Sequence, residues 1–459
     1  EVNMATAYND TDIVLGTKYE TGRGNIRGWF NKRYLVNGAQ TTDVTQLFEV
    51  GDVSANRFQY AYEQKSFPTN INIQAIASDT MNHIGKIKKV APNYIIGVPN
   101  FRNSRSRKDL VLGLSNTATI TYNVAVWPTM DTCKYLASSV FSWDSVGAAV
   151  IQDSVPVTSP YMYKLIAGGN SAYPVNALAV ANFGSDGFAD IVAGFTSAPG
   201  AGGFELWINT LNIPSAPAFD GKYSETRIFP EDSTGQLWTG MGEVTALDAA
   251  DIVGSASADL VVGTRDGIAL GSIVIYTGTG TPSGANKWFT KLITLNALGE
   301  VTCLKLIDIN GDGKKDIVAG VRTAEYQGNV QVWLQDASGT AFGMLNAASQ
   351  RICSYFAPFT DAEPVCLDAA IMKWNPTLPT PAPHIVVGVR STEITGKALI
   401  FDCSLGVLPE TGTDASGGAY AGAVAAVKIA DFNMDGRKDI SVADKNGINE
   451  GRLIIYYAQ

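Results

Sequence analysis

Several residue types are scarce in this 459-residue chain, and each shortage excludes a class of protein. Charged residues are 17% of the sequence, compared with about 25% in an average globular protein. No apolar run approaches the length that a membrane-spanning helix needs. The net charge of −9 argues against a nucleic-acid partner, because binding to phosphates depends on surplus Lys and Arg.

Cysteine and histidine are also rare. The five cysteines have no Cys-x-x-Cys spacing and are too sparse for a disulfide scaffold, so at most two disulfides can form and their pairing stays open. Buried thiols that act as small apolar groups are the favoured interpretation for most of them. The cysteines are Cys133, Cys303, Cys353, Cys366 and Cys403.

Glycine and apolar residues, in contrast, are plentiful. The chain contains 46 glycines, and hydrophobic residues make up 46% of it. This composition is typical of a turn-rich all-β protein and excludes a disordered chain or a collagen. The first residue is Glu1 and not Met, which fits a secreted chain after removal of a signal peptide as well as an excised fragment. An extracellular or cell-surface location is the expectation.

An internal repeat organises the whole sequence. An acidic residue, an apolar run and a glycine recur in seven units, the last two imperfectly, and an aromatic residue follows 17 positions later, or 18 in the second unit. Gly-rich or polar stretches between the two halves predict turns that join strands. The units begin at Asp12, Asp109, Asp190, Asp259, Asp316, His384 and Asp439, and their aromatic residues are Trp29, Trp127, Trp207, Tyr276, Trp333, Phe401 and Tyr456.

Each unit predicts four antiparallel strands. A further apolar run precedes the acidic residue, clearest from Glu243, Glu300, Glu363 and Ala423, and an outer strand is readable in connections such as 288–293 and 351–355. Seven such units predict one all-β domain, a seven-bladed β-propeller over residues 1–459. The predicted blades cover about 1–50, 91–170, 173–235, 243–295, 300–358, 363–415 and 422–457, with insertions at about 52–90 and 130–172.

Two loops between the first and second strands carry the pattern Asp-x-Asn-x-Asp-Gly-x-x-Asp. Oxygen ligands at alternating positions suit Ca²⁺, and a main-chain carbonyl at Lys314 or Arg437 can complete the shell. Two calcium ions are therefore predicted. Their side-chain ligands are Asp308, Asn310, Asp312 and Asp316 in one loop, and Asp431, Asn433, Asp435 and Asp439 in the other.

The other loops keep less of this pattern. A third ion is possible at Asn182, Asp186 and Asp190, where Gly184 replaces one ligand. The fourth loop retains only Asp251, Ser255 and Asp259, the second carries Arg and Lys, and the sixth ends in His384. A lone His at such a position is more often structural than a ligand. The calcium sites are therefore expected to be confined to two or three loops.

These loops, together with the strand spacing, resemble the FG-GAP or VCBS-type repeat of the integrin α-subunit propeller and of many secreted microbial proteins. The resemblance covers essentially the whole chain, and is strongest in the fifth and seventh units. It implies a β-propeller with calcium in hairpin loops and functions that are mostly binding. Propellers that look like this one also serve as lectins and polysaccharide lyases, and fold alone does not decide function.

The residues favour binding over catalysis. No Gly-x-Ser-x-Gly elbow, His-Glu-x-x-His motif or phosphate-binding loop occurs, and the two histidines, His83 and His384, fall in different units. The expected role is a calcium-stabilised adhesion or surface-assembly module, whose partner is another protein, a copy of itself or a surface glycan. A carbohydrate-binding lectin or a polysaccharide lyase is the alternative. The repeated aromatic residues favour packing between blades over a sugar platform.

Partner contacts are expected on the face opposite the calcium loops. Long connections between blades lie there, and long loops on a rigid scaffold commonly carry binding. Glu1, Glu243, Glu300 and Glu363 begin inner strands on that face and either form an acidic arc that binds or are solvated strand ends.

The seventh unit has no outer strand in its own repeat. An apolar edge of this kind invites another strand, because its N–H and C=O groups are unpaired. Three outcomes are possible: a segment from an insertion covers the edge, the blade stays three-stranded, or a neighbouring subunit donates the strand. Donation by a neighbour is the sharpest of these hypotheses.

Overall fold

All secondary structure in the described part of the chain is β-strand. The computed structural model describes residues 174–185, 189–210, 241–283, 287–343, 354–374, 380–406, 408–409, 412–415, 422–432, 436–445, 447 and 451–458, and elsewhere only the backbones of strands. None of these residues belongs to a helix long and apolar enough to cross a membrane.

The strands form antiparallel sheets in chain order, and we number the sheets one to seven. Sheet one consists of β1 (Ile13–Lys18), β2 (Gly24–Asn31) and β6 (Phe58–Gln64). Sheet two consists of β7 (Asn72–Ser78), β8 (Leu110–Ser115), β9 (Val124–Trp127) and β10 (Lys164–Ile166). Sheet three consists of β11 (Val175–Ala181), β12 (Asp190–Ala198), β13 (Ala201–Thr210) and β14 (Lys222–Thr226).

The remaining sheets follow the same order. Sheet four consists of β15 (Glu243–Ala250), β16 (Asp259–Arg265), β17 (Gly271–Ser283) and β18 (Lys287–Ala297). Sheet five consists of β19 (Glu300–Ile307), β20 (Asp316–Ala324) and β21 (Gln327–Gln335), with β22 (Phe342–Gly343) and β23 (Ser354–Phe359) both paired to β21. Sheet six consists of β24 (Glu363–Met372), β25 (Ala382–Arg390), β26 (Gly396–Asp402) and β27 (Thr413–Asp414). Sheet seven consists of β28 (Ala423–Ala430), β29 (Asp439–Lys445), β30 (Gly451–Tyr456) and β5 (Phe48–Glu49), while β3 (Leu35–Val36) and β4 (Ala39–Gln40) form a separate pair.

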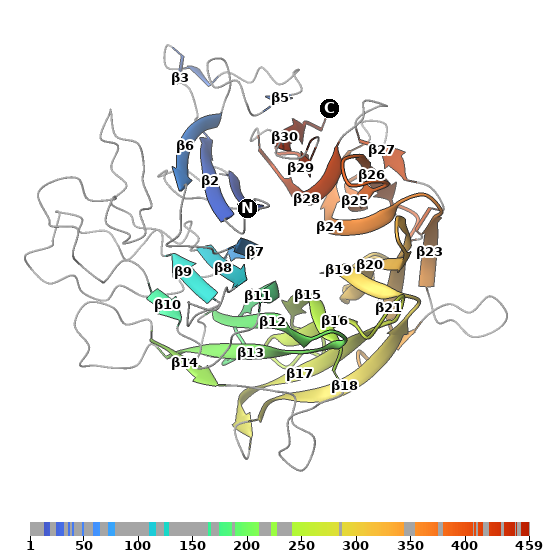
Figure 1. Cartoon of the computed structure of the whole chain (residues 1–459). Coiled ribbons are helices and arrows are strands. Elements are labelled where there is room, and N and C mark those ends of the chain that lie inside the picture. The colour runs from blue at the N-terminus through green and yellow to red at the C-terminus, as the bar shows by residue number, and fades with distance from the viewer. Residues whose placement is uncertain are drawn as a thin grey trace, which may run out of the picture.

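The sheets follow one another round a common centre (Figure 1). From sheet two on, the first strand of each sheet contacts the first strand of the next, from β7 to β11, β15, β19, β24 and β28, and β1 of sheet one contacts β7. Pairing of β30 with β5 then joins the last sheet to the N-terminal part of the chain. This is the arrangement of a β-propeller, and the all-β prediction is confirmed for the described residues.

The constant spacing between the acidic and aromatic residues of the repeat reflects a constant register of the hairpin between the second and third strands. In every sheet the residue after the acidic position lies opposite the aromatic residue, as Ile317 lies opposite Trp333. The second unit has a spacing of 18 because its hairpin is longer, yet Leu110 still lies opposite Trp127. The same pairing holds for Ile13 with Trp29, Ile191 with Trp207, Leu260 with Tyr276, Ile385 with Phe401 and Ile440 with Tyr456.

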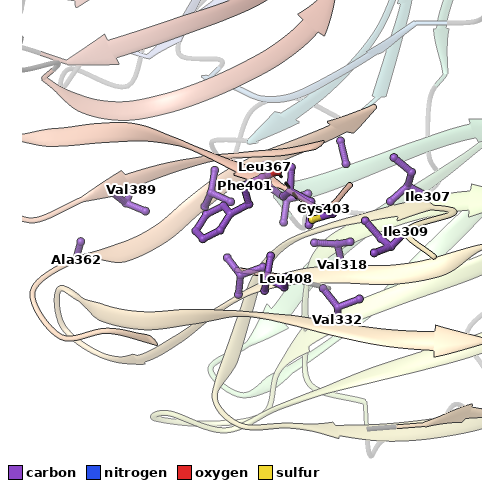
Figure 2. Packing of buried hydrophobic residues seen from close by; sticks show 14 residues of the cluster. Ile307, Ile309, Val318, Val332, Ala362, Leu367, Val389, Phe401, Cys403 and Leu408 are labelled. Carbon is purple, nitrogen blue, oxygen red and sulfur yellow. Dashed lines mark hydrogen bonds between the residues drawn. The ribbon is translucent and has the colours of Figure 1, made fainter. Parts of the chain in front are cut away.

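The core consists of layers between neighbouring sheets. Phe401 of sheet six lies in one cluster with Ile307, Val318 and Val332 of sheet five (Figure 2). Tyr276, Trp333 and Tyr456 likewise lie in clusters that join their own sheet to the preceding one. The interpretation of the aromatic residues as packing between blades is therefore confirmed for these four.

The glycine of the repeat allows this close approach. A Cβ atom at Gly263 would lie 2.5 Å from Val301 Cγ1 in the next sheet, and one at Gly194 would lie 2.2 Å from Val244 Cγ1. Real side chains cannot approach so closely, so glycine is required at these two positions, where the second strand of one sheet meets the first strand of the next.

A β-bulge lies near the start of the inner strands of sheets two to seven, and two of these bulges add polar contacts between sheets. In β15 and β19 the register shifts at the third residue of the strand, which leaves that residue unpaired. Thr245 Oγ1 there donates to Val301 O of sheet five at 2.5 Å, and Thr302 Oγ1 donates to Pro364 O of sheet six at 2.8 Å. The bulges thus direct side-chain hydrogen bonds from one sheet to the next.

The first two sheets differ from the predicted boundaries. Strands β6 and β7 both lie inside residues 52–90, a stretch expected to be an insertion between blades. Strand β10 lies inside the expected insertion at 130–172, but also within the predicted second blade at 91–170. The inner strand β7 was not predicted because it begins 37 residues before the acidic residue of its unit, Asp109. The inner strands β15 and β19 begin only 16 residues before theirs.

The outer edge of sheet seven is paired within the chain. Phe48 and Glu49 of β5 lie opposite Ile455 and Ile454 of β30. The hypothesis that a neighbouring subunit donates this strand is therefore wrong for the described residues. A segment of the same chain pairs with Ile454 and Ile455 of this edge, and it precedes the stretch at 52–90 from which such a segment was expected.

Candidate functional site

The loop from Asp308 to Asp316 joins β19 to β20 and is fully described. Asp308 Oδ1 accepts hydrogen bonds from the amides of Gly311 and Asp312, and its Oδ2 accepts one from Gly313 at 2.8 Å. Gly311 and Gly313 have φ angles of 78° and 86°, which other residues rarely adopt. The loop is therefore a tight turn stabilised by its own carboxylate.

The other predicted ligands of this loop also bond within it. Asp312 Oδ1 accepts a hydrogen bond from the amide of Lys314, and Asn310 Nδ2 donates to Asp312 Oδ2 at 3.1 Å. The Lys314 ammonium group donates to the carbonyl of Asp336 outside the loop. In the described residues no three His, Cys, Asp or Glu side chains are gathered as a metal cage.

Asp316 is fully buried and connects three segments of its sheet. Its Oδ2 accepts a hydrogen bond from the amide of Ile309 in the loop, and its Oδ1 accepts one from Gln335 at the end of β21, both at 2.9 Å. Burial raises the pKa of Asp316 to about 6, and the negative charges of Asp312 and Asp308 act in the same direction. A carboxylate in this environment gains from a nearby cation.

The same carboxylate arrangement recurs in other sheets. Asp259 accepts hydrogen bonds from Ile252 and Gly278, and Asp439 accepts them from Phe432 and Ala458. In each case one partner lies seven residues before the carboxylate and the other 19 residues after it. Asp190 accepts from Phe183, its equivalent partner. The acidic residue of the repeat therefore holds the loop against the third strand.

The second predicted calcium loop is described only in part. Asp431, Arg437 and Asp439 are described, whereas Asn433 and Asp435 lie outside the described residues. Asp431 Oδ1 is buried and has no hydrogen-bond partner among the residues described. Asp186 of the third loop also lies outside the described residues, while Asn182 is the first residue after β11 and Asp190 begins β12.

These residues fit a hard cation by their chemistry. Every predicted side-chain ligand offers oxygen. An ionised carboxylate has about four acceptor sites, so one that accepts up to three amides keeps a lone pair for a metal. The buried Asp431 Oδ1 lacks a donor among the described residues. If calcium binds, Asp308, Asn310, Asp312 and Asp316 would hold it in one loop and Asp431 and Asp439 in the other. The ion would supply positive charge among carboxylates, which stabilises the hairpin.

The glutamates on the opposite face form a paired series with arginines, which we call the Glu/Arg ladder. Glu300 lies 3.1 Å from Arg265 of sheet four and 3.0 Å from Arg322 of its own sheet. Arg322 reaches Glu363 at 3.8 Å, and Glu363 also pairs with Arg390. The ladder consists of Glu243, Arg265, Glu300, Arg322, Glu363 and Arg390.

The ladder bears on the acidic arc that the glutamates were expected to form on this face. Glu243, Glu300 and Glu363 begin their inner strands as predicted and are buried, and each pairs with arginine. Burial opposes ionisation of Glu243, but bonds from Arg265 and the Gly200 amide outweigh it, so the pKa of Glu243 lies below its ordinary value. The three described carboxylates therefore form a neutralised series and not an acidic arc. Glu1 lies outside the described residues.

A second charged series on the inner strands was missed from the sequence. Lys305 Nζ lies 3.6 Å from Asp248 Oδ2, and Lys428 Nζ lies 3.7 Å from Asp368 Oδ2 in the next pair of sheets. The charge of Asp248, aided by Asp368, raises the pKa of Lys305. Asp248, Lys305 and Asp368 each stand five residues after the glutamate of the ladder in their strand, and Lys428 stands five after Ala423. Aligning the inner strands on that position would have revealed the alternation.

His384 occupies the acidic position of the sixth unit and is buried. Its Nδ1 lies 2.9 Å from the carbonyl oxygen of Ala382, and its Nε2 lies 3.8 Å from Asp402 Oδ1. The ring thus bonds locally, where Asp316 bonds to two distant amides. This agrees with a structural residue.

Comparisons with known proteins identify no family. No family model matches the chain, and no curated protein matches it. Among solved structures, one similar chain is described as the structure of the Dos1 propeller, with a TM-score of 0.41 and 9% sequence identity. The match covers 96% of this chain and 75% of that chain.

Proposed function

We propose that this chain is an extracellular, calcium-stabilised, seven-bladed β-propeller of the FG-GAP type that binds another protein or copies of itself. Its role would be adhesion or surface assembly and not catalysis. The fold supports the propeller part of this proposal, and the donor chemistry of the Asp308–Asp316 loop supports the calcium part.

The observation that carries the binding role is a group of exposed apolar side chains on the face of the Glu/Arg ladder. Ile268 is 97% exposed and Leu270 62% exposed in the turn between β16 and β17, and Leu298, which is 54% exposed, lies between β18 and β19. Gly271 pairs with Ala297, so Leu270 and Leu298 are neighbours. Water-exposed apolar groups gathered at one place mark surfaces that bind other proteins.

The test compares substitutions on the two faces. Leu298→Glu places a charge in the apolar group, and Leu405→Glu does the same on the calcium-loop face, where Leu405 is 86% exposed. We expect Leu298→Glu to abolish concentration-dependent self-association or capture of a native surface protein, with no effect of Leu405→Glu. Equal binding by both variants and the unmodified chain would refute the proposed face.

A further inference from the structure

The loop of sheet four, residues 251–259, has the same backbone arrangement as the predicted calcium loop of sheet five. Asp251 Oδ1 accepts the amides of Gly254 and Ser255 at 2.7 and 2.9 Å. Asp308 Oδ1 accepts the amides at the same two positions of its own loop. Both loops also have positive φ angles at their fourth and sixth residues. Sheet four therefore keeps the shape of the predicted calcium loop.

The side chains at two predicted ligand positions differ between these loops. Val253 stands where sheet five has Asn310. Ser255 stands where sheet five has Asp312, so the loop of sheet four carries one carboxylate fewer. Valine offers no oxygen atom, and a neutral hydroxyl attracts a cation less than a carboxylate does. The loop of sheet four also has less mutual repulsion for a cation to relieve.

A pair of serine hydroxyls holds the loop of sheet four to the third strand of its sheet. Ser257 is 1% exposed, and its Oγ donates to the carbonyl oxygen of Gly278 in β17 at 3.0 Å. The hydroxyl of Ser255 lies 3.0 Å from that of Ser257. In sheet five this position is Lys314, whose longer and less buried side chain donates to the carbonyl oxygen of Asp336. The contact in sheet four is therefore the shorter and the better shielded from water.

The neighbouring sheets also bond to the loop of sheet four. The amide of Ala258 donates to the carbonyl oxygen of Asn182 in the loop of sheet three at 2.9 Å. Gln335 Nε2 of sheet five donates to the carbonyl oxygen of Ile252, also at 2.9 Å. Hydrogen bonds thus hold this loop from its own sheet and from the sheets on either side.

We infer that the loop of sheet four is a calcium-independent form of the site, held by Ser255 and Ser257, and that residues 253 and 255 decide which form a loop takes. Calcium then matters where these positions carry Asn and Asp, as in sheet five. Its removal loosens sheet five and leaves sheet four intact. The part of this inference that concerns sheet five rests on the proposed function, whereas the serine contacts of sheet four do not.

Hydrogen exchange compares the two loops within one molecule. The reporters are pairs of amides that donate to equivalent carboxylates, those of Ile252 and Gly278 to Asp259, and those of Ile309 and Gln335 to Asp316. With EDTA in place of excess calcium, we expect the protection of the sheet-five amides to fall about tenfold and that of the sheet-four amides to change by less than about twofold. Equal loss of protection in both loops would overturn the inference.

The variant Ser257→Ala tests the serine contacts without depending on calcium. It removes the bond to Gly278, so the protection of the Ile252 amide should fall about tenfold in calcium and in EDTA alike. The amide of Ile309 should keep its protection and is the control in the same protein. Unchanged protection of Ile252 would refute the role of the serine pair. If this variant behaves as expected but EDTA affects neither loop, the calcium part of the proposed function fails and the calcium-independent loop stands.

Restoring the ligands tests whether residues 253 and 255 decide the form of the loop. Val253→Asn combined with Ser255→Asp restores both side chains of sheet five, whereas Val253→Asn combined with Ser255→Ala restores only the first and is the control. We expect the first double variant to bind one calcium ion more than the unmodified chain, and the control to bind no more, by atomic emission after dialysis. Asp312→Ala is measured alongside, because its loss of an ion separates this result from a failure of the proposed function. Unchanged calcium content in the folded first variant would overturn the assignment of these two residues.

Discussion

At the scale of single residues, the acidic residue of the repeat has two possible uses for the same oxygen atoms. Its recurrence with Asn and Gly was interpreted as metal ligation, and the structure shows that Asp316 also accepts two main-chain amides. Both uses require an ionised carboxylate at a strand end, so the sequence pattern alone cannot separate them. Asp251, Ser255 and Asp259 show the difference: that loop keeps the amide bonds of Asp259 although most of the ligand pattern is lost.

Tyr276 provides a prediction at this scale. Its hydroxyl is buried without a hydrogen-bond partner in the described part, and burial raises the pKa of the phenol. Burying an unpaired hydroxyl costs about 1–3 kcal/mol. Tyr276→Phe should therefore leave the free energy of unfolding unchanged or raise it by about 1 kcal/mol in urea denaturation. Tyr456→Phe, at the equivalent position of β30, is the reference. A loss above about 1 kcal/mol would mean that the Tyr276 hydroxyl has a partner.

At the scale of strands and hairpins, the spacing of the repeat predicted the hairpins but not the β-bulges. The interval of 17 residues located the hairpins, because register repeats whenever turn length repeats. The bulges at Thr245 and Thr302 were not predicted, since nothing in an alternating apolar pattern marks which residue is unpaired. Their hydrogen-bond partners belong to the next sheet, more than 50 residues away in sequence.

Thr302 allows these contacts between sheets to be tested. Thr302→Val keeps the shape of the side chain but removes the hydrogen bonds from Oγ1 to Gly320 O and Pro364 O. Val365 occupies the equivalent position in sheet six, so valine is sterically acceptable there. We expect a loss of about 1–2 kcal/mol in the free energy of unfolding. The exposed Thr290→Val is the control, and equal stability of the two variants would contradict the role of the bulge.

The Asp308–Asp316 loop provides the calcium prediction. Extracellular modules bind calcium with dissociation constants of about 10⁻⁴–10⁻³ M, so about 10 mM calcium should stabilise the fold by roughly 1.5–3 kcal/mol per site. Chelation should lower the melting temperature correspondingly. Asp312→Ala should lose part of this shift and bind one ion fewer, whereas Asp251→Ala should not. Unchanged metal content in Asp312→Ala, measured by atomic emission, would contradict the site.

At the scale of the whole molecule, the sequence predicted the ring but not all of its strand partners. Sheets three to seven begin where the repeats indicated, as Glu243, Glu300 and Glu363 show. The strands β6, β7 and β5 were missed because their partners are chosen by long-range pairing, which leaves no periodic trace in a short segment. The sequence predicts the glutamates of the Glu/Arg ladder at the start of inner strands, but not the arginines that pair with them.

Closure of the ring by β5 can be tested by hydrogen exchange. Because β5 belongs to the same chain, protection of the amides of residues 453–456 should not depend on protein concentration. Protection of β20 residues, which lie between two strands of one sheet, is the reference. If the protection of residues 453–456 increased with protein concentration while that of β20 did not, a neighbouring subunit would supply the outer strand.

The pairing of β5 with β30 also affects how the protein is made. Glu49 and Ile454 are partners that stand 405 positions apart in the chain. At about 5–20 residues per second on the ribosome, roughly 20–80 s pass between the synthesis of the two. During that time later sheets can assemble on earlier ones in the order in which they are synthesised. Strand β5 stays without its partner until β30 has been made. Factors that shield unpaired strand edges from aggregation would therefore act most usefully on this protein before β30 leaves the ribosome.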